Sequence, residues 1–337
     1  MYKIVIIFLL FLSISCSGQK SSILNQEKKL QKILADPSQE EIEELLFNLR
    51  KKNYPAKNVI VHDTIILSNS NVLYILSSII EDNRHFGAVI IPHKAKNKKL
   101  PVVILATGGD GMSTQFDITS DFNHKAAKFP NLLGTDLNNQ FIIVIPSFRG
   151  QNMIIGDKQF QSEGSVNDAF DGAAKDTIGF LNAALDTFDI MDEHNISICG
   201  GSRGGTVALL ASIRDERISK VSITAAPTDM KSLYLLYPNQ FKLLFFNDFL
   251  SGKISKENAR IKFISSSPIY FTEYLPHIQI HHDESDPFVP VKFAKQLEND
   301  MIKNRKEVKA FYYNEGIHGF WDDSKYWTRV QKFLSNK

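Results

Sequence analysis

Cysteine is scarce in this chain of 337 residues, which contains only Cys16 and Cys199. Two cysteines are too few for a disulfide-rich scaffold and provide no spacing typical of a metal site. A disulfide between them is improbable, because Cys16 follows a leader segment and Cys199 lies in a predicted buried strand. The chain also lacks basic runs, aromatic-basic alternation, internal repeats and low-complexity blocks. With a net charge of only +2, it is not expected to bind nucleic acid or any strongly charged partner.

The overall composition is ordinary for a soluble globular protein. Hydrophobic residues make up 43% of the chain and charged residues 23%, which allows a substantial core. The length suits one large domain or two small ones.

The first 15 residues have the features of a targeting segment. Lys3 supplies a positive charge, the apolar run from Ile4 to Leu12 is too short to span a bilayer comfortably, and Cys16 follows three small or apolar residues. This arrangement resembles a bacterial lipoprotein signal at residues 1–16, in which the cysteine is acylated. It implies export to the bacterial cell envelope and anchoring through Cys16 in a membrane facing the periplasm or the outside. An ordinary secretory signal or an uncleaved anchor are the alternatives.

Residues 17–57 are predicted to form a polar tether and N-terminal helices. Pro37 and Ser38 are typical of a helix start. The apolar residues that follow recur at helical spacing, which favours a helix packed on the main domain over a membrane-proximal spacer. These residues are Ile42, Leu45, Leu46 and Leu49.

The sequence pattern of the rest of the chain, residues 58–337, predicts one α/β domain. Residues 59–67, 72–80 and 87–92 are β-rich and are predicted to be antiparallel strands at one sheet edge. Continuous apolar runs then alternate with helical patterns, which predicts a parallel sheet covered on both faces. The runs are residues 101–105, 141–145, 196–199, 220–225, 277–281 and 308–313, and the helices are residues 166–185, 203–210, 291–303 and 323–333. An aromatic-rich insertion at about residues 231–268 is predicted to form a small helical cap that walls part of a substrate pocket.

A glycine-rich turn between a strand and a helix carries the pattern G-x-S-x-G, with Ser202 at its centre and Gly200 and Gly204 beside it. A serine in such a turn has an exposed hydroxyl, and the glycines avoid collisions with neighbouring strands. The pattern alone is equally compatible with a simple small-residue turn. Its position between a buried strand and a helix favours a nucleophile.

A serine nucleophile needs a base and an acid that orients the base. His318 lies in a glycine-flanked loop after the last predicted strand and is the candidate base. Asp286 is the candidate acid, because it follows a strand at a fixed distance from a Val-Pro pair; Asp283 is its rival and Glu284 a weaker one.

Two further features concern the chemistry of this site. The backbone N–H of Arg203 is a predicted oxyanion donor, and Gly108 and Gly109, after an earlier buried strand, are expected to supply the second. These glycines would equally serve a tight turn. His281 and His282 stand near acidic residues, but neighbours on a strand face opposite sides, so no metal site is expected.

The residues that carry this chemistry resemble a known branch of enzymes. Ser202, Asp286 and His318 occur in the chain order of the α/β-hydrolase fold, and the motifs Ser-Phe-Arg149-Gly150 and Asp-Pro-Phe-Val-Pro are similar to those of the prolyl oligopeptidase and dienelactone hydrolase branch. The resemblance covers about residues 85–335. It implies a structural, ion-paired role for Arg149. Many relatives have histidine at the position of Thr107, and relatives often have glycine at the position of Asp283.

Together these features predict an exported serine hydrolase that needs no cofactor and cleaves a carboxylic ester of a small or carbohydrate-linked acid. Two alternatives stay open. One is a serine peptidase of the prolyl oligopeptidase type without a propeller, and the other is a catalytically silent, lipid-anchored binding protein. The oligomeric state is not encoded in any of these motifs.

Overall fold

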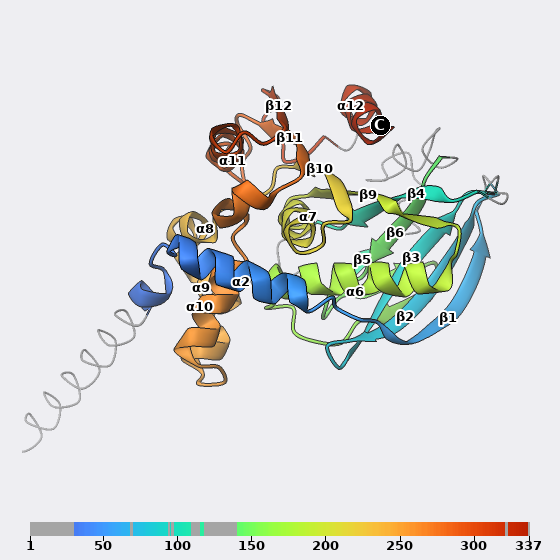
Figure 1. Ribbon diagram of the computed structural model, residues 1–337, viewed down its shortest axis with the longest axis horizontal. Coiled ribbons are helices and arrows are strands. Elements are labelled where there is room, and N and C mark those ends of the chain that lie inside the picture. The colour runs from blue at the N-terminus through green and yellow to red at the C-terminus, as the bar shows by residue number, and fades with distance from the viewer. Residues whose placement is uncertain are drawn as a thin grey trace, which may run out of the picture.

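The computed structural model describes residues 30–67, 70–93, 95, 98–108, 115–117, 140–320 and 323–335. Within them, nine strands form one sheet in the order β1-β2-β3-β6-β4-β9-β10-β11-β12 (Figure 1). The strands are β1 (Lys57–Ile66), β2 (Val72–Ile80), β3 (Asn83–Ile91), β4 (Leu100–Ala106), β6 (Ile142–Pro146), β9 (Met191–Gly201), β10 (Ile218–Thr224), β11 (His277–Asp283) and β12 (Val308–Tyr313).

The sheet changes from antiparallel to parallel along its width. The neighbouring strands β1 and β2, β2 and β3, and β3 and β6 pair antiparallel. Every pairing across the rest of the sheet, from β6 to β12 in the strand order, is parallel. This confirms the predicted antiparallel edge and parallel body of an α/β-hydrolase fold. Because β6, β4, β9, β10, β11 and β12 all run in one direction, the loops that follow them meet at the carboxyl end of these strands.

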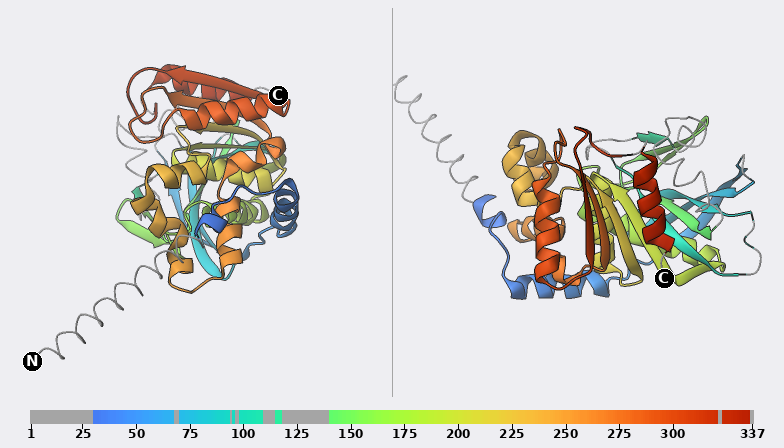
Figure 2. Two further views of the ribbon diagram at one scale, coloured as in Figure 1. Left: turned by 90° about the vertical axis from the view of Figure 1, so that its left-hand side faces the viewer. Right: turned by 90° about the horizontal axis from the view of Figure 1, so that it is seen from above.

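Helices cover both faces of the sheet, so each central strand must present apolar side chains to both faces, as β4 does. Val102 and Ile104 belong to the core cluster on one face, and Val103 and Leu105 to the cluster on the other. This is why the strand is a continuous apolar run. Figure 2 shows α11 and α12 on opposite sides of the sheet. The first face is covered by α6 (Asp171–Thr187), α7 (Arg203–Arg214) and α11 (Lys292–Lys303), and the second by α12 (Ser324–Ser335).

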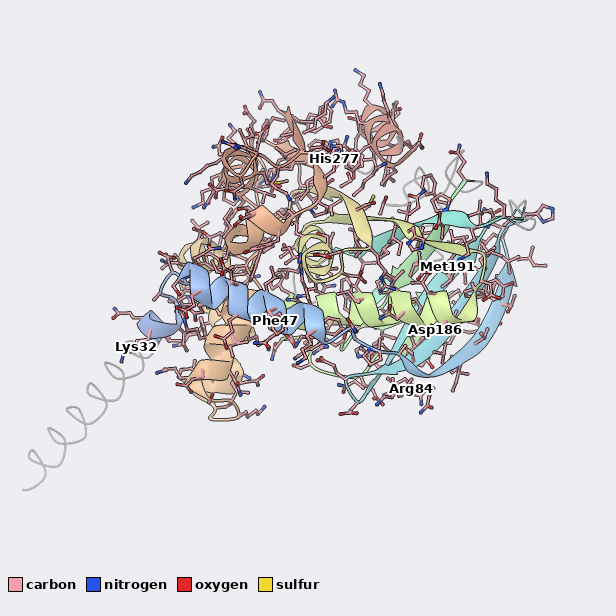
Figure 3. All side chains as sticks on the ribbon, in the orientation of Figure 1. Lys32, Phe47, Arg84, Asp186, Met191 and His277 are labelled. Carbon is pink, nitrogen blue, oxygen red and sulfur yellow. The ribbon has the colours of Figure 1, made fainter. Side chains whose placement is uncertain are left out.

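The N-terminal helix α2 (Gln39–Lys51) packs on α7, as its amphipathic pattern predicts. Ser38 caps it by accepting a hydrogen bond from the Glu41 N–H. Phe47 lies on its outward side and is 65% exposed (Figure 3). No helix within the described ranges is long and apolar enough to cross a bilayer, and residues 1–29, with Cys16, lie outside those ranges.

The predicted insertion forms three helices, α8 (Met230–Leu236), α9 (Pro238–Leu250) and α10 (Lys256–Ser265). Their aromatic side chains join the main core; the Phe245 ring stacks on Phe170 and meets Phe263 edge to face. Arg260 of α10 also pairs with Glu41 of α2. The insertion is therefore anchored firmly to the body of the domain.

A small second sheet was not predicted from the sequence. It consists of β5 (Gln115–Asp117), β7 (Asn152–Ile155) and β8 (Lys158–Gln161), in the order β5-β7-β8. Met153 and Ile155 of β7 contribute to the core on the α12 face. The strands have three or four residues each, too few for a period-2 pattern to be recognised.

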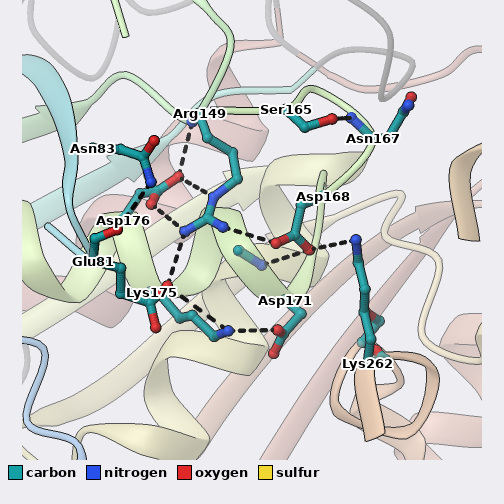
Figure 4. A network of polar contacts seen from close by, with 12 residues as sticks. Glu81, Asn83, Arg149, Ser165, Asn167, Asp168, Asp171, Lys175, Asp176 and Lys262 are labelled. Atoms are coloured by element: carbon teal, nitrogen blue, oxygen red, sulfur yellow. Dashed lines mark hydrogen bonds and ion pairs between the residues drawn. The ribbon is translucent and has the colours of Figure 1, made fainter. Parts of the chain in front are cut away.

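Arg149 follows β6 and lies at the centre of a buried ionic network (Figure 4). Its guanidinium donates to Asp176 at 2.7 and 3.0 Å and to Asp168 at 2.8 Å. Asp176 lies on α6 and its side chain is fully buried. Burial alone would lower the pKa of Arg149, but the carboxylates of Asp176, Asp168 and Glu81 raise it above its ordinary value. The network ties α6 to the end of β6, in agreement with the ion-paired structural role inferred from the sequence.

We expect Arg149→Ala to destabilise the fold by about 3–5 kcal/mol, because it leaves the Asp176 carboxylate buried without its cation. Urea unfolding followed by circular dichroism measures the loss. Lys158→Ala is the control, since it breaks the surface ion pair with Asp63 and should barely change the midpoint. Equal midpoints for the two variants would contradict a structural role for Arg149.

Candidate active site

Ser202 occupies a sharp turn between β9 and α7. Its backbone angles are φ 52° and ψ −125°, a conformation that is strained for any residue with a side chain. Its N–H donates to the Thr224 carbonyl at 2.8 Å, which ties the turn to the neighbouring strand β10. This geometry is typical of a nucleophile elbow, in which the strained turn lifts the hydroxyl above the sheet.

The glycines beside Ser202 are required by close backbone packing. A Cβ atom on Gly204 would lie 2.1 Å from the Ala106 carbonyl oxygen at the end of β4. A Cβ on Gly200 would lie 2.2 Å from the Gly204 carbonyl oxygen. Any side chain at either position would therefore push the elbow apart.

The structure brings Asp286 and His318 together, although 32 positions separate them in the chain. Asp286 lies in the loop after β11 and His318 in the loop after β12. The Nδ1 atom of His318 and the Oδ2 atom of Asp286 are 2.8 Å apart. Because an ionised carboxylate can only accept hydrogen bonds, Nδ1 is the donor in this contact, and in a neutral ring Nε2 then carries the lone pair that can accept a proton.

The environment of Asp286 favours its charged form. Burial alone would raise the pKa of its carboxyl group, but hydrogen bonds from the His318 ring and from the N–H groups of Val289 and Phe288 lower it below its ordinary value. The side chain is completely buried, whereas His318 is partly exposed. Asp286 thus stays ionised to a lower pH than a free aspartate and can orient the histidine throughout the neutral range.

Ser202, Asp286 and His318 follow β9, β11 and β12, so all three stand at the carboxyl edge of the sheet. Among the described residues, no hydrogen bond joins the Ser202 hydroxyl to the His318 ring. Such contacts are commonly long in enzymes without substrate and tighten when substrate binds. The arrangement is that of a nucleophile, a base and an orienting acid.

The predicted oxyanion loop follows β4. A Cβ on Gly108 would be 3.1 Å from the Gly201 carbonyl oxygen and 3.9 Å from the Ser202 Cβ, so Gly108 lies directly beside the elbow. Gly109, the other predicted loop donor, lies outside the described residues. The predicted donor Arg203 is the first residue of α7, directly after Ser202.

The side chain of Arg203 has a role that the sequence did not reveal. It is buried, and its Nη2 atom donates to the Gly108 carbonyl at 3.0 Å. The guanidinium also lies over the Phe148 ring, 5.3 Å from its centroid. Arg203 therefore links the elbow to the predicted oxyanion loop through its side chain as well as its position.

The neighbouring histidines of β11 face opposite sides, as expected for a strand. The ring of His281 contacts the Tyr313 hydroxyl at 2.7 Å, and His282 donates from Nε2 to the Val289 carbonyl at 2.8 Å. Burial lowers the pKa of both rings. In the part of the chain that the structure describes, no three His, Cys, Asp or Glu residues are grouped in a way that could hold a metal ion.

Cys199 lies in β9, three residues before the nucleophile. Its thiol is buried, and burial raises its pKa to about 12. The side chain packs in the core on the α12 face. It is therefore a small core residue, as the sequence suggested, and not a reactive thiol.

Part of the helical insertion borders the site. The Tyr237 hydroxyl, at the end of α8, donates to the Phe288 carbonyl at 3.1 Å. The Phe288 ring meets the His318 ring edge to face, with centroids 5.4 Å apart. Phe288 is nevertheless 65% exposed, and Ile317 beside the histidine is 37% exposed. Two exposed apolar side chains therefore lie next to His318.

Comparison with solved structures shows the same fold in both esterases and peptidases. An acylaminoacyl peptidase in complex with Z-Gly-Gly-Phe-chloromethyl ketone matches 82% of this chain at 14% identity with a TM-score of 0.58. This chain spans only 49% of that peptidase. Acetyl xylan esterase 1 from Thermoanaerobacterium sp. matches 90% of this chain and 97% of its own, at 16% identity and a TM-score of 0.60. The acetyl xylan esterase from Paenibacillus sp. R4 matches 90% and 98%, at 14% identity and a TM-score of 0.61.

The fold, with a serine elbow beside an aspartate–histidine pair, defines the class of α/β-hydrolase serine hydrolases, and this protein is one of them. Residues 107–336 match the model of the prolyl oligopeptidase family. The chain belongs to that family. A comparison with curated protein sequences gave no match.

We expect Arg203→Met to lower kcat about tenfold or more, because it frees the Gly108 carbonyl and loosens the loop beside the elbow. KM should change much less, since the side chain does not face solvent. Steady-state kinetics with an aryl acetate measures both constants. Arg203→Lys is the matched variant, as it keeps the charge and one donor and should retain more activity. Unchanged kcat in Arg203→Met would contradict this role.

Proposed function

We propose that the protein is an exported carboxylesterase that cleaves esters of small acids, such as acetyl groups on a carbohydrate or an apolar alcohol. The observation that carries this proposal is the 2.8 Å contact between His318 and Asp286 at the edge of the sheet where the Ser202 elbow stands. The same constellation would serve a serine peptidase, which is the second candidate.

In the first half of the reaction, the Ser202 hydroxyl transfers its proton to Nε2 of His318 while its oxygen bonds to the substrate carbonyl carbon. The charged imidazole is stabilised by the Asp286 carboxylate. The carbonyl oxygen becomes negative, and the Arg203 N–H and a donor from the loop of Gly108 and Gly109 stabilise it. The intermediate then collapses, the ester C–O bond breaks, and His318 gives its proton to the departing alcohol.

In the second half, water replaces the alcohol. His318 takes a proton from the water while the water oxygen attacks the acyl carbon. His318 then returns that proton to the Ser202 oxygen as the acid is released. The chemistry requires no group beyond these side chains and backbone donors. An amide would follow the same steps but has a poorer leaving group.

One support for an ester substrate is the length of the solved structures that this chain matches. This chain aligns with almost the whole length of two acetyl xylan esterases, 97% and 98%, but with about half of the acylaminoacyl peptidase. Phe288 and Ile317, the exposed apolar side chains beside His318, would suit the apolar part of a small ester.

The ester reading can be tested with matched substrates that differ only in the scissile bond. We expect p-nitrophenyl acetate and acetylated xylo-oligosaccharides to be hydrolysed well, and p-nitroacetanilide and aminoacyl p-nitroanilides poorly. Ser202→Ala should lower kcat by about 10⁴-fold or more. The residual hydrolysis rates of Ser202→Ala give the baseline for the ester and the anilide series.

Two outcomes would change the assignment. Anilides turned over well, with esters no faster than in Ser202→Ala, would replace the esterase by the peptidase. Turnover of neither series above the Ser202→Ala baseline would favour the lipid-anchored binding protein.

Export and lipid anchoring are part of the same proposal and rest on the leader sequence before Cys16. In a bacterial host fed a palmitate analogue, we expect the wild-type chain to take up label and to sediment with membranes. Cys16→Ser should lose both properties. Cys199→Ser is the control and should keep both, because that thiol is buried. Membrane association that survives Cys16→Ser would contradict anchoring through this residue.

A further inference from the structure

Asp283, the rival candidate for the catalytic acid, does not contact the histidine but has a different set of partners. It is the last residue of β11, and its side chain is fully buried. Its carboxylate accepts three backbone hydrogen bonds: from the Ser285 N–H at 2.8 Å, the Glu315 N–H at 2.7 Å and the Gly316 N–H at 3.1 Å. Hydrogen bonds to a charged acceptor are about twice as strong as neutral ones.

The three donors belong to the two loops that carry the candidate acid and base. Ser285 directly precedes Asp286, and Glu315 and Gly316 lie three and two residues before His318. The Asp283 carboxylate therefore connects both loops through one buried group.

The connection begins where the sheet ends. Strands β11 and β12 pair in register up to Asp283 and Tyr313, and one further backbone hydrogen bond joins the Glu284 N–H to the Tyr313 carbonyl at 2.7 Å. Beyond this point the described backbone of the two loops is no longer paired as a sheet. Instead, hydrogen bonds to the Asp283 side chain connect one loop to the other.

Small displacements matter at this site. The His318–Asp286 contact is a single hydrogen bond between two loops, and a shift of about 1 Å in such a group can cost on the order of 100-fold in rate. Neither loop is held by a disulfide within the described residues. A fixed distance between the loops therefore depends on backbone hydrogen bonds such as those to Asp283.

We propose that Asp283 is a positioning residue for catalysis: its buried carboxylate holds the His318 loop against the Asp286 loop and so maintains the hydrogen bond between the two side chains. This inference rests on the proposed roles of Asp286 and His318. The three hydrogen bonds of the Asp283 side chain go to backbone N–H groups and not to the side chains of Ser202, Asp286 or His318.

Asp283→Asn tests the proposal with almost no change in shape. The amide keeps one acceptor, loses the charge, and turns an NH₂ group toward a backbone N–H. We expect kcat for p-nitrophenyl acetate to fall about 10- to 100-fold with KM within about twofold. The downfield proton resonance of His318 Nδ1–H should also broaden or disappear, because it reports the hydrogen bond to Asp286 directly.

Asp215→Asn is the matched control. Asp215 is also buried and accepts hydrogen bonds from the backbone N–H and the guanidinium of Arg217, but it lies before β10, at the amino end of the parallel strands. It should lower the unfolding temperature without changing kcat or the resonance. Both variants are compared at a temperature at which circular dichroism shows them fully folded. If Asp283→Asn does not fold, Asp283→Glu is used, because its extra methylene displaces the charge and should lower kcat in the same way.

The proposal is overturned if a folded Asp283 variant keeps both kcat and the His318 resonance, or if Asp215→Asn loses as much kcat. The resonance depends on the histidine–aspartate contact and not on the substrate. An incorrect ester assignment would therefore appear as absent turnover in the wild type, while the effect of Asp283→Asn on the resonance would still be measured.

Discussion

The backbone of Ser202 is held in a conformation that serine does not adopt freely, and the site is built around that constraint. Ser202 has a positive φ in this elbow. Because Gly200 and Gly204 carry no side chains, the end of β9, the start of α7 and the end of β4 can come into contact around it. The hydrogen bond from Ser202 to Thr224 then fixes the elbow to β10. Strain of this kind costs about 1–3 kcal/mol and persists only when the surrounding packing over-determines it.

That packing comes from a sheet whose parallel part is buried on both faces. The two core clusters on either side of β4 hold the strand ends in place, and the ionic network around Arg149 ties α6 to β6. The loops that carry Asp286 and His318 leave this rigid edge and are joined again by the Asp283 carboxylate. Rigid strands and short, tethered loops thus determine where the reactive groups stand.

Much of this could be read from the sequence. Continuous apolar runs predicted the parallel strands, and the order of Ser202, Asp286 and His318 predicted which loops would meet, because that order follows from the strand topology. The short strands of the second sheet escaped detection, since three or four residues carry no periodic signal. The hydrogen bonds of Arg203 to Gly108 and of Asp283 to Glu315 escaped detection because these partners are backbone groups distant in sequence, which no side-chain pattern records.

The central claim is that Ser202 is the nucleophile, and covalent labelling tests it most directly. Intact-mass spectrometry after incubation with a fluorophosphonate should show one adduct per chain, and peptide mapping should locate it on Ser202. The adduct should be absent from Ser202→Ala and should form much more slowly in His318→Ala. Absence of labelling in the folded wild-type protein, or an adduct on another residue, would contradict the claim.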